Sequence, residues 1–240
     1  MKTRYTASED DYFAKRKQLL GRVESLDEIA DHFPLFIRRQ VLVRYFTRYS
    51  LFQKILDVKG SIVECGVHKG SSLMLYAQLS AIYEPYALNR EIIGFDTFEG
   101  FPEINREKDG DNPEVGELAD TDLELLKGCI DLYDQNRPIG HLPKVRLVQG
   151  DATQTIPQFF KDNSYSVVAL LYMDFDLYAP TKVALETILP RMPKGAVIAF
   201  DEVNDKLWPG ETSAMLEIMN MRNLQLQKCP ADPFISYAVL

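Results

Sequence analysis

The sequence predicts an α/β protein with a Rossmann-like, mostly parallel sheet of seven strands, helices on both faces, and an N-terminal helical segment. Three observations support this fold class. From residue 61 onward, short strand-like segments alternate with helical patterns, as in right-handed βαβ units. The segments VVALLY and AVIAF are apolar throughout, as strands buried on both faces are. The final segments, LQLQK and FISYAVL, are expected to form an antiparallel pair.

The alternation predicts the individual elements in order. Strands are expected at residues 61–65, 91–96, 144–151, 166–173 and 196–200, before the two C-terminal segments. Helices are expected at residues 70–83, 120–134, 153–160, 181–190 and 209–220. Residues 99–120 are rich in Gly, Pro, Asp and Glu, which predicts a long loop of the kind that often covers a site.

The N-terminal part has a different pattern. Apolar side chains recur there at three- and four-residue spacings, as at Ile37, Val41 and Leu42, which predicts helices over residues 8–58. We therefore expect a helical cap or oligomer segment at residues 1–58 and a ligand-binding domain at residues 59–240. The basic stretch RRQVLVRYFTR is expected to form a solvated helix face.

Composition excludes several classes of protein. The 240-residue chain has 27 basic and 35 acidic residues and a net charge of −8, which argues against a nucleic-acid-binding protein. Its three cysteines are widely spaced and form no CxxC pair, so neither a zinc ribbon nor a disulfide framework is expected. A cytoplasmic location is expected, because no signal peptide and no membrane span of roughly 18 apolar residues is present.

The end of the first strand carries the first candidate binding residues. In a doubly wound sheet, ligands bind beyond the carboxyl ends of the strands. Glu64 and Gly66 stand at this position, and Ser71 and Ser72 begin the next helix, whose amide groups face the same crevice. The stretch is neither GxGxxG nor a phosphate-binding P-loop. An acidic Glu64 suits a cationic part of a ligand, such as an amino group.

The second and third strands also end on carboxylates. Asp96 can accept hydrogen bonds from a ribose diol, or it can serve as a cap or loop carboxylate. Asp151 can bind an adenine amino group, or it can cap the helix that begins at Thr153. The residue types alone leave both alternatives open at both positions.

The fourth and fifth strands end on two acidic pairs, Asp174 with Asp176 and Asp201 with Glu202. Consecutive strands of this type are often neighbours, and several carboxylates in one crevice repel each other unless protonated or joined to a cation. Oxygen ligands without nearby Cys or His favour Mg²⁺, Mn²⁺ or Ca²⁺. The alternative is that each acid caps the following helix, with Asp176 the strongest candidate.

Taken in order, these stretches resemble the macrocin O-methyltransferase family, within the class I S-adenosylmethionine-dependent methyltransferases. The matching stretches are SIVECGVHKGSS, GFDTFEGFP, LVQGDATQTIP, YMDFDLYAPT and AVIAFDEV. The resemblance implies a fold, an activity in natural-product biosynthesis and a set of binding roles. The methionine end of the cofactor would contact Glu64 and Gly66, the ribose Asp96, the adenine Thr97, Phe98, Asp151 and Ala152, and Mg²⁺ would bind Asp174, Asp201 and Glu202.

The implied reaction is methyl transfer to a hydroxyl of a sugar or another small hydroxylated metabolite, in a homo-oligomer. A divalent cation lowers the pKa of a bound hydroxyl, and Asp174 or Asp176 accepts the proton, with His68 and His141 as alternative bases. Two rival functions are a dinucleotide-dependent oxidoreductase and a non-catalytic cofactor-binding scaffold. The missing GxGxxG motif counts against the first.

Overall fold

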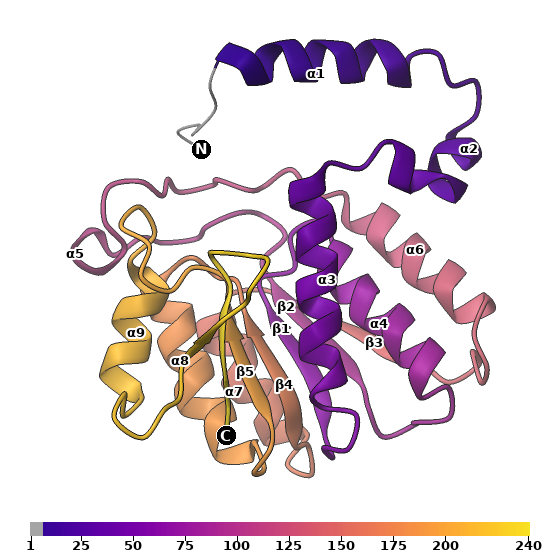
Figure 1. Ribbon diagram of the computed structural model, residues 1–240. Helices are drawn as coiled ribbons and strands as arrows, with labels where there is room; N and C mark the ends of the chain where they lie inside the picture. The colour runs from indigo at the N-terminus through magenta and orange to yellow at the C-terminus, as the bar shows by residue number, and fades with distance from the viewer. Residues whose placement is uncertain (1–6) are drawn as a thin grey trace. The chain divides into compact units, whose positions relative to one another are not determined.

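The computed structural model describes residues 7–240, and the chain divides into two compact units with the boundary between Arg44 and Tyr45 (Figure 1). The smaller unit holds α1 (Ala7–Leu20), α2 (Leu26–Asp31), a 3-10 turn (Phe33–Leu35) and the start of α3 (Arg39–Gln53). Within this unit, Arg16 Nε donates a hydrogen bond of 3.0 Å to the carbonyl oxygen of Phe36. Leu26 and Leu35 are 84% and 79% exposed. A role of this segment in oligomer contacts stays a prediction.

The larger unit is built on one seven-stranded sheet in the order β3-β2-β1-β4-β5-β7-β6. All pairs from β3 to β5 are parallel, and β7 is antiparallel to both β5 and β6. The winding therefore reverses between β1 and β4, where a ligand crevice is expected. The strands are β1 (Ser61–Cys65), β2 (Ile92–Asp96), β3 (Val145–Gln149), β4 (Val168–Met173), β5 (Val197–Phe200), β6 (Gln227–Lys228) and β7 (Ser236–Val239).

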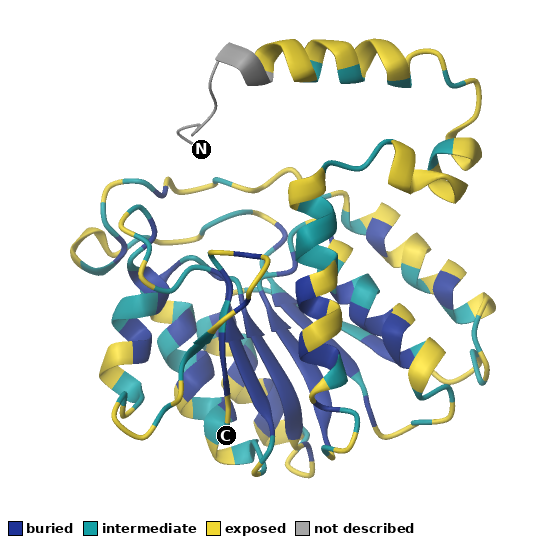
Figure 2. Ribbon diagram, viewed as in Figure 1, coloured by how far each residue is buried: buried dark blue, intermediate teal, exposed yellow. Residues whose placement is uncertain are grey.

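Helices cover both faces of this sheet, as the sequence predicts. One buried cluster joins α3, α4 and α6 to side chains such as Ile62 and Tyr172, and the other joins α7, α8 and α9 to side chains such as Val63 and Leu171. Every residue of β1, β4 and β5 is buried, which confirms the prediction from their apolar runs (Figure 2). The helices are α4 (Ser71–Tyr83), α6 (Leu123–Gln135), α7 (Ala152–Asp162), α8 (Tyr178–Ile188) and α9 (Gly210–Ile218).

Three local expectations differ from the structure. The predicted loop at 99–120 contains a short helix, α5 (Arg106–Asp109), whose first N–H groups are capped by Asn105. Helix α8 begins at Tyr178, earlier than residue 181, so that Pro180 falls in its first turn, where proline is tolerated. The basic stretch 38–48 is not a wholly solvated face, since Thr47 and Arg48 are buried. Among residues 7–240, no helix has the length and apolar character needed to cross a membrane.

Candidate active site

The loop between β1 and α4, residues 66–70, lies at the switch point of the sheet, and we call it the cofactor loop. The Asp96 carboxylate at the end of β2 shapes it, since Oδ2 accepts hydrogen bonds from the amides of Val67 (2.7 Å) and His68 (2.8 Å). Its Oδ1 accepts one from the amide of Phe98 at 2.7 Å. Asp96 is therefore a loop carboxylate in this structure, and its proposed contact with ribose would be an additional role.

Glu64 is fully buried at the end of β1, directly before this loop. Ser72 Oγ, on the first turn of α4, donates a hydrogen bond to Glu64 Oε1, while Oε2 makes none. Burial raises the pKa of Glu64 to about 7, opposed by the hydrogen bond from Ser72 and the charge of Arg48. A buried carboxylate with a free oxygen is suited to receive a positively charged group of a ligand.

The residues assigned to adenine and ribose lie at the same edge of the sheet. Thr97 Oγ1 donates a hydrogen bond of 2.7 Å to the Gly100 carbonyl oxygen, and Phe98 is 6% exposed with a left-handed φ of 57°. Asp151 caps α7, because its carboxylate accepts hydrogen bonds from the Thr153 amide at 2.9 Å and the Thr153 hydroxyl at 2.7 Å. The capping alternative is thus confirmed for Asp151, and contacts of these residues with a cofactor stay a prediction.

The acidic pairs meet as expected, because β4 and β5 are neighbours and both pairs follow the carboxyl ends of these strands. The backbone fixes this arrangement: the amide of Asp174 donates to the Cys65 carbonyl at 2.7 Å, and that of Asp201 donates to the Met173 carbonyl at 3.0 Å. A fifth carboxylate, Glu211 on α9, joins them. We call this set the acid cluster: Asp174, Asp176, Asp201, Glu202 and Glu211.

Asp176 does not cap the following helix. The N-cap of α8 is Leu177, which makes no side-chain cap, and Asp176 has a left-handed φ of 62°. Its own amide is 3.4 Å from Glu211 Oε1, which also accepts a hydrogen bond from the Phe175 amide at 3.1 Å. Burial raises the pKa of Asp176 well above its ordinary value, and the carboxylates of Asp174 and the rest of the cluster raise it further.

Arg48, a buried arginine on α3, reaches the acid cluster. Its Nη2 lies 3.7 Å from Asp174 Oδ2 and 4.0 Å from Asp201 Oδ1, and its guanidinium lies over the ring of Tyr172. Tyr172 in turn donates a hydrogen bond of 2.6 Å from its hydroxyl to Asp201 Oδ1. Burial alone lowers the pKa of Arg48, but the groups around it raise it, so the net shift is upward and the side chain stays charged.

The acid cluster has the donor set of a hard divalent cation. Its members carry only oxygen donors, and Glu211, fully buried, has one oxygen, Oε2, that accepts no hydrogen bond. Across residues 7–240, no group of three His, Cys, Asp or Glu side chains is already arranged as a metal site. The residues therefore match Mg²⁺ by the chemistry of their oxygen donors, and its binding is a matter for proposal.

The two histidines considered as alternative bases, His68 and His141, lie at opposite edges of the sheet. His68 lies on the cofactor loop, where its Nε2 is 2.7 Å from Asp120 Oδ1. His141 is exposed and precedes β3, so it lies at the amino edge of the sheet, opposite the crevice. The structure thus does not bring His141 to the candidate site. His68 lies at the carboxyl edge of the sheet, where the candidate site is, and its ring is paired with Asp120.

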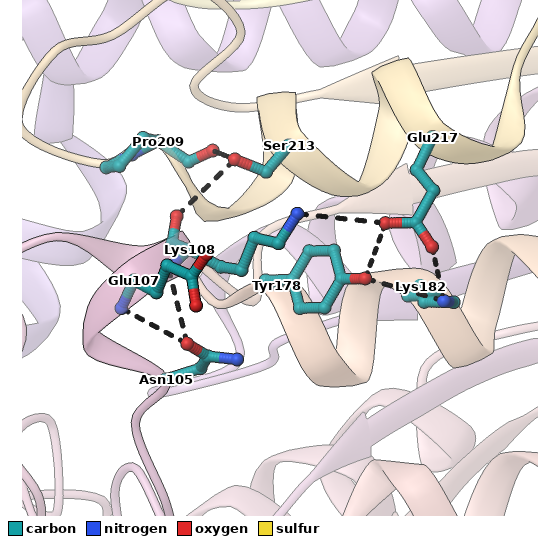
Figure 3. A network of polar contacts seen from close by, with 8 residues as sticks. All are labelled: Asn105, Glu107, Lys108, Tyr178, Lys182, Pro209, Ser213 and Glu217. Atoms are coloured by element: carbon teal, nitrogen blue, oxygen red, sulfur yellow. Dashed lines mark hydrogen bonds and ion pairs between the residues drawn. The ribbon is translucent and has the colours of Figure 1, made fainter.

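The loop between β2 and α6 is fixed in its middle by Asp109, which is 2% exposed. The Oδ1 of Asp109 accepts a hydrogen bond of 2.6 Å from the Tyr178 amide at the start of α8, and Oδ2 accepts one of 2.8 Å from the Asn105 amide. Around it, Lys108 and Lys182 both pair with Glu217, and Ser213 Oγ lies 3.4 Å from the Lys108 carbonyl oxygen (Figure 3). The α5 part of the loop is therefore attached to α8 and α9.

Asp109→Ala is expected to destabilise the protein by about 1.5–3 kcal/mol, because it removes the buried carboxylate that accepts hydrogen bonds from the amides of Tyr178 and Asn105. Urea unfolding measures the loss, and limited proteolysis within residues 97–122 should become faster. The matched control is Asp111→Ala, an exposed neighbour. Equal midpoints for both variants would show that Asp109 does not hold the loop.

Three residues of this site, Arg48, Glu211 and Asp109, are not among those predicted from the sequence. Arg48 lies on the same face of α3 as Leu51 and Phe52, three and four residues further on, so its burial could have been predicted from this spacing. Glu211 lies three and four residues before the buried Ala214 and Met215. Asp109 gives no such signal, because its partners are backbone amides distant in sequence.

Comparison with known proteins gives consistent matches. Residues 51–230 match the family model described as Macrocin-O-methyltransferase (TylF). A crystal structure of CalS11, a calicheamicin methyltransferase, is 34% identical, superposes with a TM-score of 0.93, and the match covers 99% of this chain and 94% of that one. An apo structure of CalS11, described as a TDP-rhamnose 3'-O-methyltransferase, is 33% identical with a TM-score of 0.85, over 99% and 96% of the chains.

A curated relative is more distant. It is the 8-demethyl-8-(2,3-dimethoxy-alpha-L-rhamnosyl)-tetracenomycin-C 4'-O-methyltransferase of Streptomyces olivaceus, 28% identical over 156 residues, which are 60% of this chain and 53% of that protein. The match therefore spans about half the length of this relative. The O-methyltransferase NovP shares the fold, with a TM-score of 0.63 at 18% identity over 82% of this chain and 79% of that one.

Proposed function

Because the chain belongs to the macrocin O-methyltransferase family, we propose that it transfers a methyl group from S-adenosylmethionine to a hydroxyl group of a sugar. A rhamnose-type sugar, carried on a nucleotide or on an aglycone, is the proposed acceptor. One relative is named a TDP-rhamnose methyltransferase and another a rhamnosyl-tetracenomycin methyltransferase. The observation that carries the proposal is the family match over residues 51–230, which include both the cofactor loop and the acid cluster.

We propose that the cofactor lies across the cofactor loop. Glu64 would bind the ammonium group of its methionine end, since Oε2 of this buried carboxylate makes no hydrogen bond. Gly66 leaves room for close approach, and Ser71 and Ser72 present the first amides of α4. Asp96 would bind the ribose, with the remaining contacts from Thr97, Phe98, Asp151 and Ala152. The bound cofactor supplies an electrophilic methyl group on sulfonium.

We propose that Asp174, Asp201 and Glu202 hold Mg²⁺, which would lower the pKa of an acceptor hydroxyl and orient it. Asp174 or Asp176 would accept the proton of that hydroxyl as its oxygen forms a bond to the methyl carbon and the carbon–sulfur bond breaks. Asp176 suits this role, because it belongs to the acid cluster but is not one of the three proposed metal ligands. The products are the methyl ether and S-adenosylhomocysteine.

The test is an incubation of the full chain with S-adenosylmethionine, Mg²⁺ and TDP-rhamnose, followed by mass spectrometry for one added methyl group. Aryl rhamnosides and unrelated nucleotide sugars provide the comparison series. Methylation of at least one rhamnose-type acceptor, and its loss in EDTA, is the expected result. If the chain binds the cofactor but methylates no member of the series, the non-catalytic scaffold becomes the better explanation.

Cofactor affinity is expected to depend on pH through Glu64. Its pKa is raised to about 7, and only the ionised form attracts a cationic group, so affinity should increase as pH rises toward 7 and level off above it. Calorimetry of S-adenosylmethionine binding between about pH 5.5 and 7.5 should show a change approaching roughly tenfold per pH unit below the pKa. Glu64→Gln should bind more weakly and lose this slope. A slope that persists in Glu64→Gln would assign it to another group.

A further inference from the structure

Arg48 brings a positive charge from α3 into the acid cluster, although α3 precedes the first strand of the sheet. Its side chain is 6% exposed, and its guanidinium carbon lies 4.7 Å from the centre of the Tyr172 ring. The same nitrogen, Nη2, faces one carboxylate from the end of β4 and one from the end of β5, at 3.7 Å and 4.0 Å. The guanidinium thus bridges the two strand ends on which the proposed metal ligands stand.

The position of Arg48 does not depend on these carboxylates alone. Its contacts with Asp174 and Asp201 are longer than hydrogen bonds, so they act through charge. A cation–π contact with the Tyr172 ring also holds the guanidinium, and the hydroxyl of the same tyrosine donates a hydrogen bond to Asp201. Arg48, Tyr172 and Asp201 therefore form one set of contacting side chains, in which a covalently attached cation lies beside a proposed metal ligand.

A cation in this place has two opposite effects on a metal site. Without metal, it reduces the repulsion among the five carboxylates and keeps Asp174 and Asp201 side by side. With metal, it repels the ion, because Mg²⁺ lies only about 2.1 Å from its ligand oxygens and therefore close to a guanidinium that faces those same oxygens. The two effects on metal affinity have opposite signs, and we take the repulsion between the two cations as the larger one.

We propose that Arg48 is a positioning residue: a built-in counter-cation that holds Asp174 and Asp201 together in the metal-free protein and keeps Mg²⁺ weakly bound and exchangeable. This inference rests on the proposed function, because it takes Asp174 and Asp201 as metal ligands. It also makes α3 part of the active site, so the helix does more than cover the sheet.

The test compares Arg48→Met, Arg48→Lys and the wild-type chain, each saturated with S-adenosylhomocysteine. Calorimetric titration with Mg²⁺ should give a Kd that is about tenfold lower, or lower still, for Arg48→Met, and within about threefold of wild type for Arg48→Lys, which keeps the charge. In EDTA, Arg48→Met should have a lower Tm than wild type, and saturating Mg²⁺ should remove at least half of the gap, because the tighter-binding protein gains more from the ion.

Arg146→Met is the matched control, since Arg146 also lies over an aromatic ring, that of Phe159, but on β3, away from the acid cluster. Its Mg²⁺ affinity should equal that of wild type. Equal or weaker Mg²⁺ binding by a folded Arg48→Met would overturn the proposal. If Arg48→Met does not fold in EDTA, the double variant Arg48→Met, Asp201→Asn restores the charge balance of the cluster. We expect this double variant to fold in EDTA. If it does not fold, the result counts against the counter-cation role.

A failure of the proposed metal site can be distinguished from a failure of the proposed role of Arg48. If wild type binds S-adenosylhomocysteine but no Mg²⁺, the metal site fails, and the effect of Arg48 on metal affinity fails with it. The counter-cation role is then decided in EDTA by a double-mutant cycle of Arg48→Met and Asp201→Asn on Tm. A coupling between the two substitutions supports the role, and additive effects remove it.

Discussion

Asp174→Ala is expected to lower the turnover of sugar methylation by about a thousandfold, while the Kd of S-adenosylmethionine changes by no more than a few-fold. Asp174 directly follows β4, beside Arg48 and next to the strand that carries Asp201. Its side chain is 24% exposed and is thus open to the crevice, unlike that of Asp201, which is 4% exposed. Removal of this carboxylate takes away both a proposed metal ligand and one candidate base.

The cofactor should remain bound because its proposed contacts are elsewhere. Glu64 and Asp96 hold their positions through Ser72 and the amides of the cofactor loop, and none of these bonds involves the Asp174 side chain. The backbone of Asp174, which contacts β1 through the Cys65 carbonyl oxygen, is unchanged by the substitution. If Asp174→Ala loses methyl transfer but still binds S-adenosylmethionine, the substitution has removed a group needed for the reaction and has left the fold of the cofactor site intact.

The measurement is initial-rate kinetics at saturating cofactor with and without Mg²⁺, combined with calorimetry for cofactor binding. Glu186→Gln, which neutralises an exposed acid on the following helix, is the control and should keep wild-type turnover. Wild-type turnover in Asp174→Ala would remove this residue, and the metal with it, from the mechanism. A parallel loss of cofactor binding would instead indicate a structural role for the side chain.

The fold was predictable from the sequence because it depends on local patterns. The apolar runs of β4 and β5 and the alternation of strands and helices reveal a parallel sheet, and a parallel sheet brings Asp174 and Asp201 to one edge. The cofactor loop was also predictable, since Gly66 follows directly on the first strand.

Contacts between segments distant in sequence were not predictable in the same way. Arg48 meets the acid cluster only because α3 packs on one face of the sheet, and no local pattern encodes which strand end it reaches. Asp176 looked like a helix cap from its position, but the start of α8 bonds instead to Asp109 of the preceding loop. The choice between cap and ligand roles depends on which partner the fold supplies, which a single sequence does not specify.

Gly66→Ala is expected to destabilise the protein by about 3 kcal/mol or more and to weaken cofactor binding by at least about tenfold. Gly66 has a φ of 95°, where residues with a side chain are strained. An added Cβ would lie 1.9 Å from the carbonyl oxygen of Asp174 and 2.6 Å from its carbonyl carbon. These are backbone atoms of the neighbouring strand end, so no side-chain rotation relieves the clash.

The end of β1 must therefore move away from the end of β4, and this movement separates the two halves of the site. Gly66 itself is held by its amide to the Phe95 carbonyl oxygen at 2.9 Å, so the displacement also strains the pairing with β2 and the loop that Asp96 organises. Thermal and urea unfolding measure the loss of stability, and calorimetry measures the Kd of S-adenosylmethionine.

Gly128→Ala is the matched control for this substitution. Gly128 lies within α6, and a Cβ there meets no atom within 4 Å, so alanine should be neutral or should stabilise the helix by up to about 1 kcal/mol. If Gly66→Ala unfolded at the same urea concentration as wild type, β1 and β4 would have to separate freely at their carboxyl ends. The close approach of the cofactor loop to Asp174 would then not be what fixes the distance between the cofactor and the acid cluster.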